Sequence, residues 1–94
     1  MTKTLFSLLE YKAWADQELM QCLCDNEKQT TATVFHKALR MMNHIHVVDQ
    51  IFVAHLSEKN HLFTSTNTPD TPNVQTLSRD MQEISQQLLN LARQ

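Results

Sequence analysis

The sequence has no glycine, and only two prolines, among its 94 residues. Glycine supplies the positive backbone angles of hairpin turns and lets a backbone approach phosphate groups closely. Sheet folds built on tight turns and nucleotide-binding folds built on glycine-rich loops are therefore disfavoured. Helices joined by polar loops need glycine least, so the composition predicts an all-α fold.

Charge and cysteine are also scarce. The 8 basic and 10 acidic residues give a formal net charge of -2 and form no basic stripe that could follow a phosphate backbone, so we expect no nucleic-acid partner. The two cysteines, Cys22 and Cys24, would lie about 200° apart around a helix and cannot share a metal ion or a disulfide there. We interpret them as reduced thiols of a cytoplasmic protein, with Cys22 in the core.

Long apolar runs are absent too. No stretch reaches the length of a membrane-spanning helix, and the first residues lack the apolar block of a signal peptide, so no membrane partner is expected. At 94 residues the chain is long enough for one hydrophobic core and no more, which predicts a single helical domain over residues 1–94.

What the sequence does contain is a long helical pattern in its middle. Over residues 32–58, apolar side chains recur at helical spacing on two opposite sides, in lines that begin at Phe35 and Met41. A surface helix has one apolar side, whereas this helix has to be contacted from both. Four of the five histidines of the chain also lie in it, so metal-binding or catalytic residues are expected in this helix before any other part of the chain.

A first helix is predicted over residues 3–25, where leucines recur at helical spacing and Thr2 or Thr4 is available as the N-cap. The only tyrosine and the only tryptophan, Tyr11 and Trp14, fall on one side of it about a turn apart. A short polar link follows, and one of its threonines is expected to cap the central helix. So short a link implies that the two helices run antiparallel.

After the central helix, a polar loop is predicted over residues 59–71, anchored by Leu62 and Phe63. Thr71, which is followed by proline, is expected to be the N-cap of a third helix over residues 72–93. The apolar residues of this helix alternate in steps of three and four and form one seam, as in a helix made for a bundle.

Histidine spacing limits the metal sites that the helices could form. A site needs several ligands, and one helix offers two only three or four positions apart. His44 and His46 point to nearly opposite sides of the central helix, and His44 and His55 are separated by roughly 16 Å of helix rise. The remaining pairs are His46 with Asp49 and His55 with Glu58. Each pair is three positions apart, a spacing found in many helices that bind no metal ion.

Each histidine also has a purely structural interpretation. His36 would lie on a solvated edge, and His46 in a hydrogen-bonded core or interface position. His55 would lie at a helix end, where the dipole favours it, and His61 on the loop surface. No serine or cysteine has a base at the spacing of a nucleophilic site, so the catalytic residues stay unknown.

Two helical motifs and one loop resemble those of the DinB-like family. Residues 11–15, Tyr-Lys-Ala-Trp-Ala, match the Tyr-x-x-Trp-Ala motif on the first helix of that family. Residues 43–52, Asn-His-Ile-His-Val-Val-Asp-Gln-Ile-Phe, match its Asn-His-Ile-x-x-x-Asp-x-Ile-Phe type motif on the second helix. Residues 67–72, Asn-Thr-Pro-Asp-Thr-Pro, resemble the loop of one branch. The matches keep their order and spacing over nearly the whole chain.

The resemblance implies a four-helix bundle, usually dimeric, in which three histidines hold a divalent ion such as nickel or zinc. One histidine belongs to the second helix and two form a His-x-x-x-His pair on the fourth. His44 is the counterpart of the second-helix ligand. Tyr11 and Trp14 would line the pocket, and Asp49 would contact a metal-ligating side chain without binding the ion itself. The chain contains no His-x-x-x-His pair, so we interpret it as three long helices of an up-down four-helix bundle, with the fourth helix absent and the metal site incomplete.

This interpretation leaves three functions open. The first, which we expect, is a DinB-like helical bundle protein in a shortened form, without independent catalysis, that buries its uncovered apolar surface by forming a homodimer or higher homo-oligomer. The second is a divalent-metal-dependent enzyme, a thiol transferase or hydrolase-like protein, whose site is completed by a partner chain. The third is a small binding protein that holds an apolar ligand inside the bundle.

Overall fold

A computed structural model describes residues 2–94, and within them the chain forms three long α-helices, one short 3-10 helix and no strand. Helix α1 spans Lys3–Asn26, α2 spans Ala32–Leu56 and α3 spans Val74–Ala92, and the 3-10 helix η1 at Glu27–Gln29 follows α1 directly. The prediction of an all-α fold is confirmed. Each helix bound lies within two residues of its expected position. No helix of this part of the chain combines the length and the apolar character that crossing a membrane requires.

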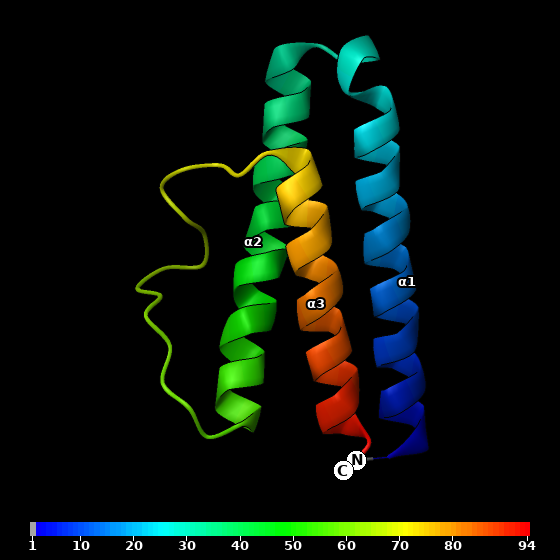
Figure 1. Cartoon of the computed structure of the whole chain (residues 1–94), viewed down its shortest axis with the longest axis vertical. Coiled ribbons are helices and arrows are strands. Elements are labelled where there is room, and N and C mark those ends of the chain that lie inside the picture. The colour runs from blue at the N-terminus through cyan, green and yellow to red at the C-terminus, as the bar shows by residue number, and fades with distance from the viewer. Residues whose placement is uncertain (1) are drawn as a thin grey trace.

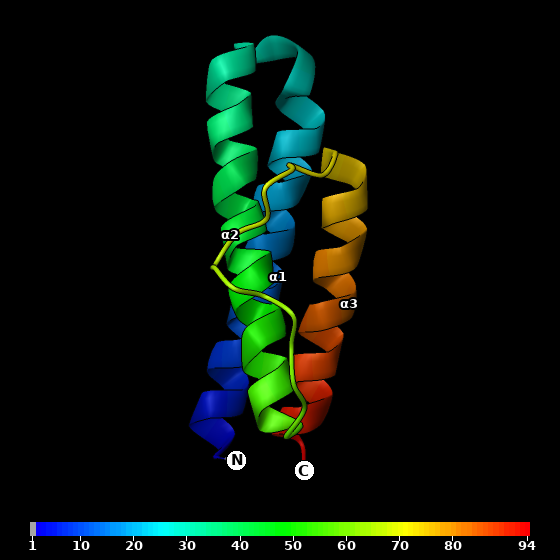
Figure 2. The same ribbon diagram turned by 90° about the vertical axis from the view of Figure 1, so that its left-hand side faces the viewer.

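The direction of α3 differs from the up-down alternation that we expected. α1 and α2 run antiparallel, as their short link predicts, but the connection after α2 returns along its outer side toward the other end of the bundle (Figures 1 and 2). α3 therefore runs parallel to α2. The physical reason is the length of the connection: residues 57–73 can extend over roughly 55 Å, whereas α3 is only about 28 Å long.

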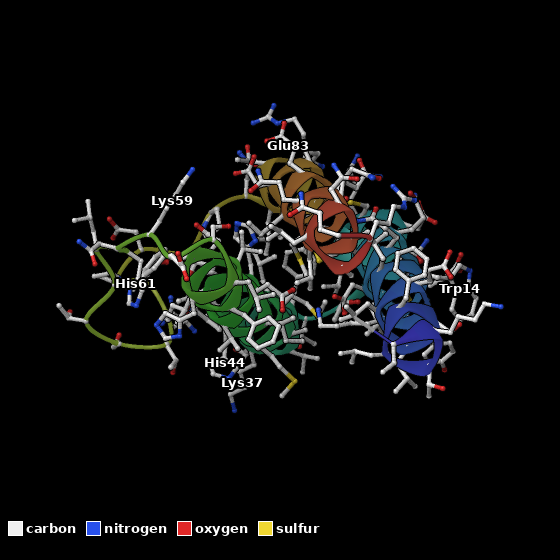
Figure 3. The ribbon with its side chains drawn as sticks, turned by 90° about the horizontal axis from the view of Figure 1, so that it is seen from below. Trp14, Lys37, His44, Lys59, His61 and Glu83 are labelled. Atoms are coloured by element: carbon white, nitrogen blue, oxygen red, sulfur yellow. The ribbon has the colours of Figure 1, made fainter. Side chains whose placement is uncertain are left out.

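The core lies where α3 packs against both other helices, on one side of the α1–α2 pair (Figure 3). One buried cluster draws on all three helices and consists of Met20, Leu39, Met42, Val74, Leu77 and Met81. A second cluster, toward the C-terminal end of α3, consists of Val53, Ile84 and Leu88. The apolar seam of α3 thus supplies half or more of each cluster, and its removal from water is the main stabilising contribution to the fold.

A side chain caps the N-terminus of each long helix, and only the predicted cap of the third helix is wrong. The Thr2 hydroxyl caps α1 and the Thr31 hydroxyl caps α2, each by accepting a backbone N–H from the first turn. Thr71, however, is not the cap of α3. Asn73 takes this role, because its side-chain oxygen accepts the N–H of Thr76 at 2.8 Å. Asparagine caps a helix at least as well as threonine, and the helix begins after it.

Two apolar side chains that we expected to be covered are exposed. Cys22 lies on α1 but away from α3, so the prediction that it belongs to the core is wrong. Leu62 is 98% exposed and does not anchor the loop, although Phe63 beside it is half-buried. The two errors have different causes. Helical spacing shows which residues share a side of α1, but packing decides which side is covered, and the loop has no periodicity from which the exposure of Leu62 could be predicted.

Candidate functional site

The residues implied by the DinB-like resemblance lie apart in the structure. His44 belongs to α2 and Trp14 to α1, and the two lie on different sides of the molecule (Figure 3). Tyr11 lies against Trp14, with 5.7 Å between their ring centroids, and both side chains are exposed. Asp49 is buried and paired with Lys12. The structure thus joins Tyr11 to Trp14 but brings neither of them to His44.

The imidazole of His44 is oriented by the backbone of the loop. Its Nδ1 lies 2.7 Å from the carbonyl oxygen of Thr66. Because a carbonyl only accepts hydrogen bonds, Nδ1 carries the hydrogen, and in the neutral ring Nε2 keeps a free lone pair. Metal-bound histidines commonly show this arrangement, in which the second nitrogen donates to a carbonyl or a carboxylate. The side chain is exposed, so a ligand can reach the ring from solvent.

A complete set of metal ligands is not present around His44. Within residues 2–94, no three His, Cys, Asp or Glu side chains converge as a metal site. His55, on the same helix, instead lies against the ring of His61, with 5.6 Å between the centroids. One imidazole holds zinc or nickel too weakly, because water fills the other positions. The residues present therefore do not fit a metal ion by themselves.

Asn43, the first residue of the second-helix motif, has a structural role that the sequence did not reveal, and Arg40 one turn before it shares this role. Arg40 and Asn43 of α2 hold the loop at Asn67 and Thr68, and we call these four residues the loop clamp. The Asn43 amide donates to the Asn67 side-chain oxygen at 2.5 Å and to the Thr68 hydroxyl at 2.7 Å. Arg40 donates to the Thr68 carbonyl at 2.6 Å, and Asn67 donates back to the Arg40 carbonyl at 3.0 Å. Asn43 is buried, so these bonds satisfy a polar group that would otherwise be costly.

A charged cluster of Lys12, Asp16 and Asp49 lies between α1 and α2. The Lys12 ammonium donates to Asp16 at 2.7 Å and to Asp49 at 2.6 Å, and both carboxylates are buried. Burial by itself lowers the pKa of Lys12, but the hydrogen bonds and negative charges of the two carboxylates outweigh it, so the pKa is raised. The spacing of Lys12 and Asp16 on one helix was the only signal in the sequence, because Asp49 joins them through the fold.

His46 is half-buried between α2 and α3. Together with Gln50 and Asp80 it lines two adjoining hollows of about 390 Å³ and about 210 Å³. Its Nδ1 is buried and has no hydrogen-bond partner among residues 2–94, so the hydrogen-bonded position expected for it is wrong. Burial lowers the pKa of His46, against the opposing charges of Asp80 and Asp49. The ring is therefore held in its neutral form near neutral pH.

On the side that faces away from α3 (Figure 3), α1 and α2 carry a series of exposed apolar side chains. On α2, positions 34, 38, 41, 45, 48 and 52 recur in steps of four and three, and on α1, positions 5, 8, 12, 15 and 19 do the same. We call these two lines the open face. Its large exposed apolar side chains are Leu5, Leu8, Leu19, Val34, Met41, Val48 and Phe52. Such spacing is the pattern of a seam at which helices pack together.

Comparison of the chain with protein-family models, with curated proteins and with solved structures gave no match. The DinB-like resemblance therefore stays a prediction that rests on the motifs alone.

Proposed function

We propose that the protein is a DinB-like helical bundle module that works by association and has no independent catalysis. The observation that supports this proposal is the open face. It carries seven large apolar side chains that are at least 40% exposed, arranged at the spacing of a helix-packing seam. Contiguous apolar surface of this kind on a soluble domain marks a site of protein association.

In a solution of the pure chain, the available occupant of the open face is a second copy. We propose that the chain forms a homodimer or higher homo-oligomer through this face. In an isologous dimer, the α1–α2 pair of one copy would pack on the same pair of the other, and together they would form a four-helix arrangement. The driving force is the burial of the exposed apolar side chains.

The test is the oligomeric state of the purified chain, measured by light scattering and native mass spectrometry over a wide range of concentration. We expect a dimer or larger species in the wild type and a monomer in Met41→Glu, which places a charge in the open face where the side chain is already 67% exposed. Leu62→Glu is the matched control, because Leu62 is exposed on the loop. A wild-type chain that stays monomeric throughout would overturn the proposal.

A second candidate function is a divalent-metal-dependent enzyme whose site is completed by a partner chain. The observation that favours it is the orientation of His44, whose Nδ1 contacts the Thr66 carbonyl at 2.7 Å and leaves Nε2 for a metal ion. The further ligands and the catalytic groups would have to come from another chain. Nickel or zinc would then supply a Lewis acid for thiol transfer or hydrolysis.

Native mass spectrometry with nickel or zinc added tests this second candidate. We expect a dimer that retains one or two ions per assembly if it holds, and loss of that metal in His44→Ala. His36→Ala is the control, since His36 is exposed on the same helix. Substantial and equal metal retention by the wild type and His44→Ala would exclude His44 as the principal ligand, and an oligomer without retained metal would leave the non-catalytic module as the function.

A further inference from the structure

We propose that His61 is a pH-sensitive latch, which holds the start of the loop against α2 while its imidazole is neutral and releases it in mild acid. The proposal concerns residues 58–63, which follow the C-cap of α2 directly. It does not involve the open face, so it is independent of the proposed function. It rests on three contacts that meet at the ring of His61.

The contact that depends most directly on charge is a hydrogen bond within the loop. The backbone N–H of Phe63 donates to Nδ1 of His61 over 3.2 Å. Nδ1 accepts through its lone pair, so it carries no hydrogen, and the hydrogen of the neutral ring is on Nε2. Both nitrogens of a protonated imidazole are donors. Protonation of His61 therefore breaks this bond and leaves the N–H of Phe63 facing a second donor.

The other two contacts place three rings in a row. His61 lies against His55 of α2, with 5.6 Å between the ring centroids, and against Phe63, with 6.0 Å. These rings attach the loop to the last turn of α2, where His55 is exposed to solvent. Histidine is the side chain that ordinarily gains its charge between about pH 8 and 5. Two charged imidazoles at this separation repel each other, so acid weakens the ring contacts as well as the hydrogen bond.

The charge of a protonated His61 meets no opposite charge in the hollow that this residue lines. The hollow has a volume of about 490 Å³ and also contains Lys59 on its wall. Within residues 2–94, no carboxylate lines it, and Glu58 on the loop and Glu83 on α3 are both exposed outside it. The residues that α2 and α3 contribute to it are uncharged: Gln50, Val53, Ala54, Ile84 and Gln87. Protonation thus places a second positive charge beside Lys59, which favours release of the loop.

Release of the latch opens this hollow without moving the helices. Phe63 lines it together with Val53 and Ile84, which belong to the second buried cluster. Once the contacts of His61 are lost, Phe63 is no longer held there, and water reaches the two apolar side chains. The loop clamp further along the loop contains no histidine, so acid leaves its hydrogen bonds intact. The change is therefore confined to residues 58–63.

Nuclear magnetic resonance of the wild-type chain at about pH 7.5 and about pH 5.5 tests the latch. Protection of the Phe63 amide against solvent exchange is measured relative to its intrinsic rate at each pH. Nuclear Overhauser effects between the rings of His55, His61 and Phe63 report the ring contacts.

We expect the protection of the Phe63 amide to fall by about tenfold in acid and the ring contacts to disappear, while the amides of α2 stay protected. Unchanged protection of Phe63 in acid would overturn the proposal. An equal loss of protection in α2 would also overturn it, because the whole chain would then be unfolding.

Two variants separate the hydrogen bond from the ring contacts. In His61→Asn, the side-chain oxygen can accept the N–H two residues on, as in an Asx turn, and has no charge to gain. We expect equal protection of Phe63 at both pH values in this variant. His61→Phe keeps a ring but has no acceptor, so we expect low protection of Phe63 at both. A pH response in His61→Asn as large as that of the wild type, or wild-type protection in His61→Phe, would rule out His61 as the latch. The wild-type comparison decides the question by itself if a variant does not fold.

Discussion

The Lys12 ammonium lies 2.6 Å from the buried Asp49 carboxylate and connects α1 to α2. These two helices otherwise meet mainly through α3, which packs against both. The ion pair therefore joins two helices that share little direct packing with each other.

Loss of the cation in the charged cluster should destabilise the chain. In Lys12→Met, two buried carboxylates lose their partner, and we expect the free energy of unfolding in urea to fall by about 1–3 kcal/mol at pH 7, less than for a fully buried pair because Lys12 is partly exposed. Lys37→Met, at an exposed position of α2, is the control. Equal stability of wild type and Lys12→Met would show that the cluster contributes nothing.

Loss of the loop clamp should loosen the connection between α2 and α3. Asn43→Ala removes two hydrogen bonds that hold Asn67 and Thr68, so we expect faster amide hydrogen exchange in the loop, with the helices protected as before. Asn60→Ala is the control, because Asn60 is exposed on the same connection. Exchange rates in the loop that match those of the control would show that the loop clamp does not restrain the loop.

The core should be far more sensitive than the loop to the loss of an apolar side chain. Met81 is 1% exposed within the cluster that joins all three helices, and we expect Met81→Ala to lower the free energy of unfolding by about 2–5 kcal/mol. Leu62→Ala should change it by less than about 0.5 kcal/mol. Similar effects of the two changes, measured by chemical denaturation, would mean that Met81 is not in the core.

His46 should make the fold less stable in mild acid. Burial lowers the pKa of His46 in the folded chain below its ordinary value of 6.5. As the pH falls through that value, the unfolded chain binds a proton that the native chain does not, so the free energy of unfolding falls with the pH. We expect His46→Gln to flatten the dependence between about pH 7 and 5. The measurement is urea denaturation at several pH values, and a slope identical to that of the wild type would contradict the assignment.

The helices and their ends follow from chemistry that is local in the chain. The lack of glycine, the apolar periodicity and the threonines at two N-caps were enough to predict the all-α fold and to place every helix bound within two residues. Even the error at the third helix is local, because Thr71 and Asn73 are both good caps two positions apart and the sequence alone does not rank them.

The arrangement of the helices depends on contacts between segments that are distant in the sequence. Periodicity predicted two apolar sides for α2, and packing against α3 decided that the side through Leu39 and Met42 is buried while the side through Met41 and Val48 is open. Likewise, the pairing of Lys12 with Asp49 and the contact of His44 with Thr66 exist only once the elements have packed. A helical pattern fixes which side chains share a face, whereas burial and long-range pairing depend on the free energy of the whole assembled core.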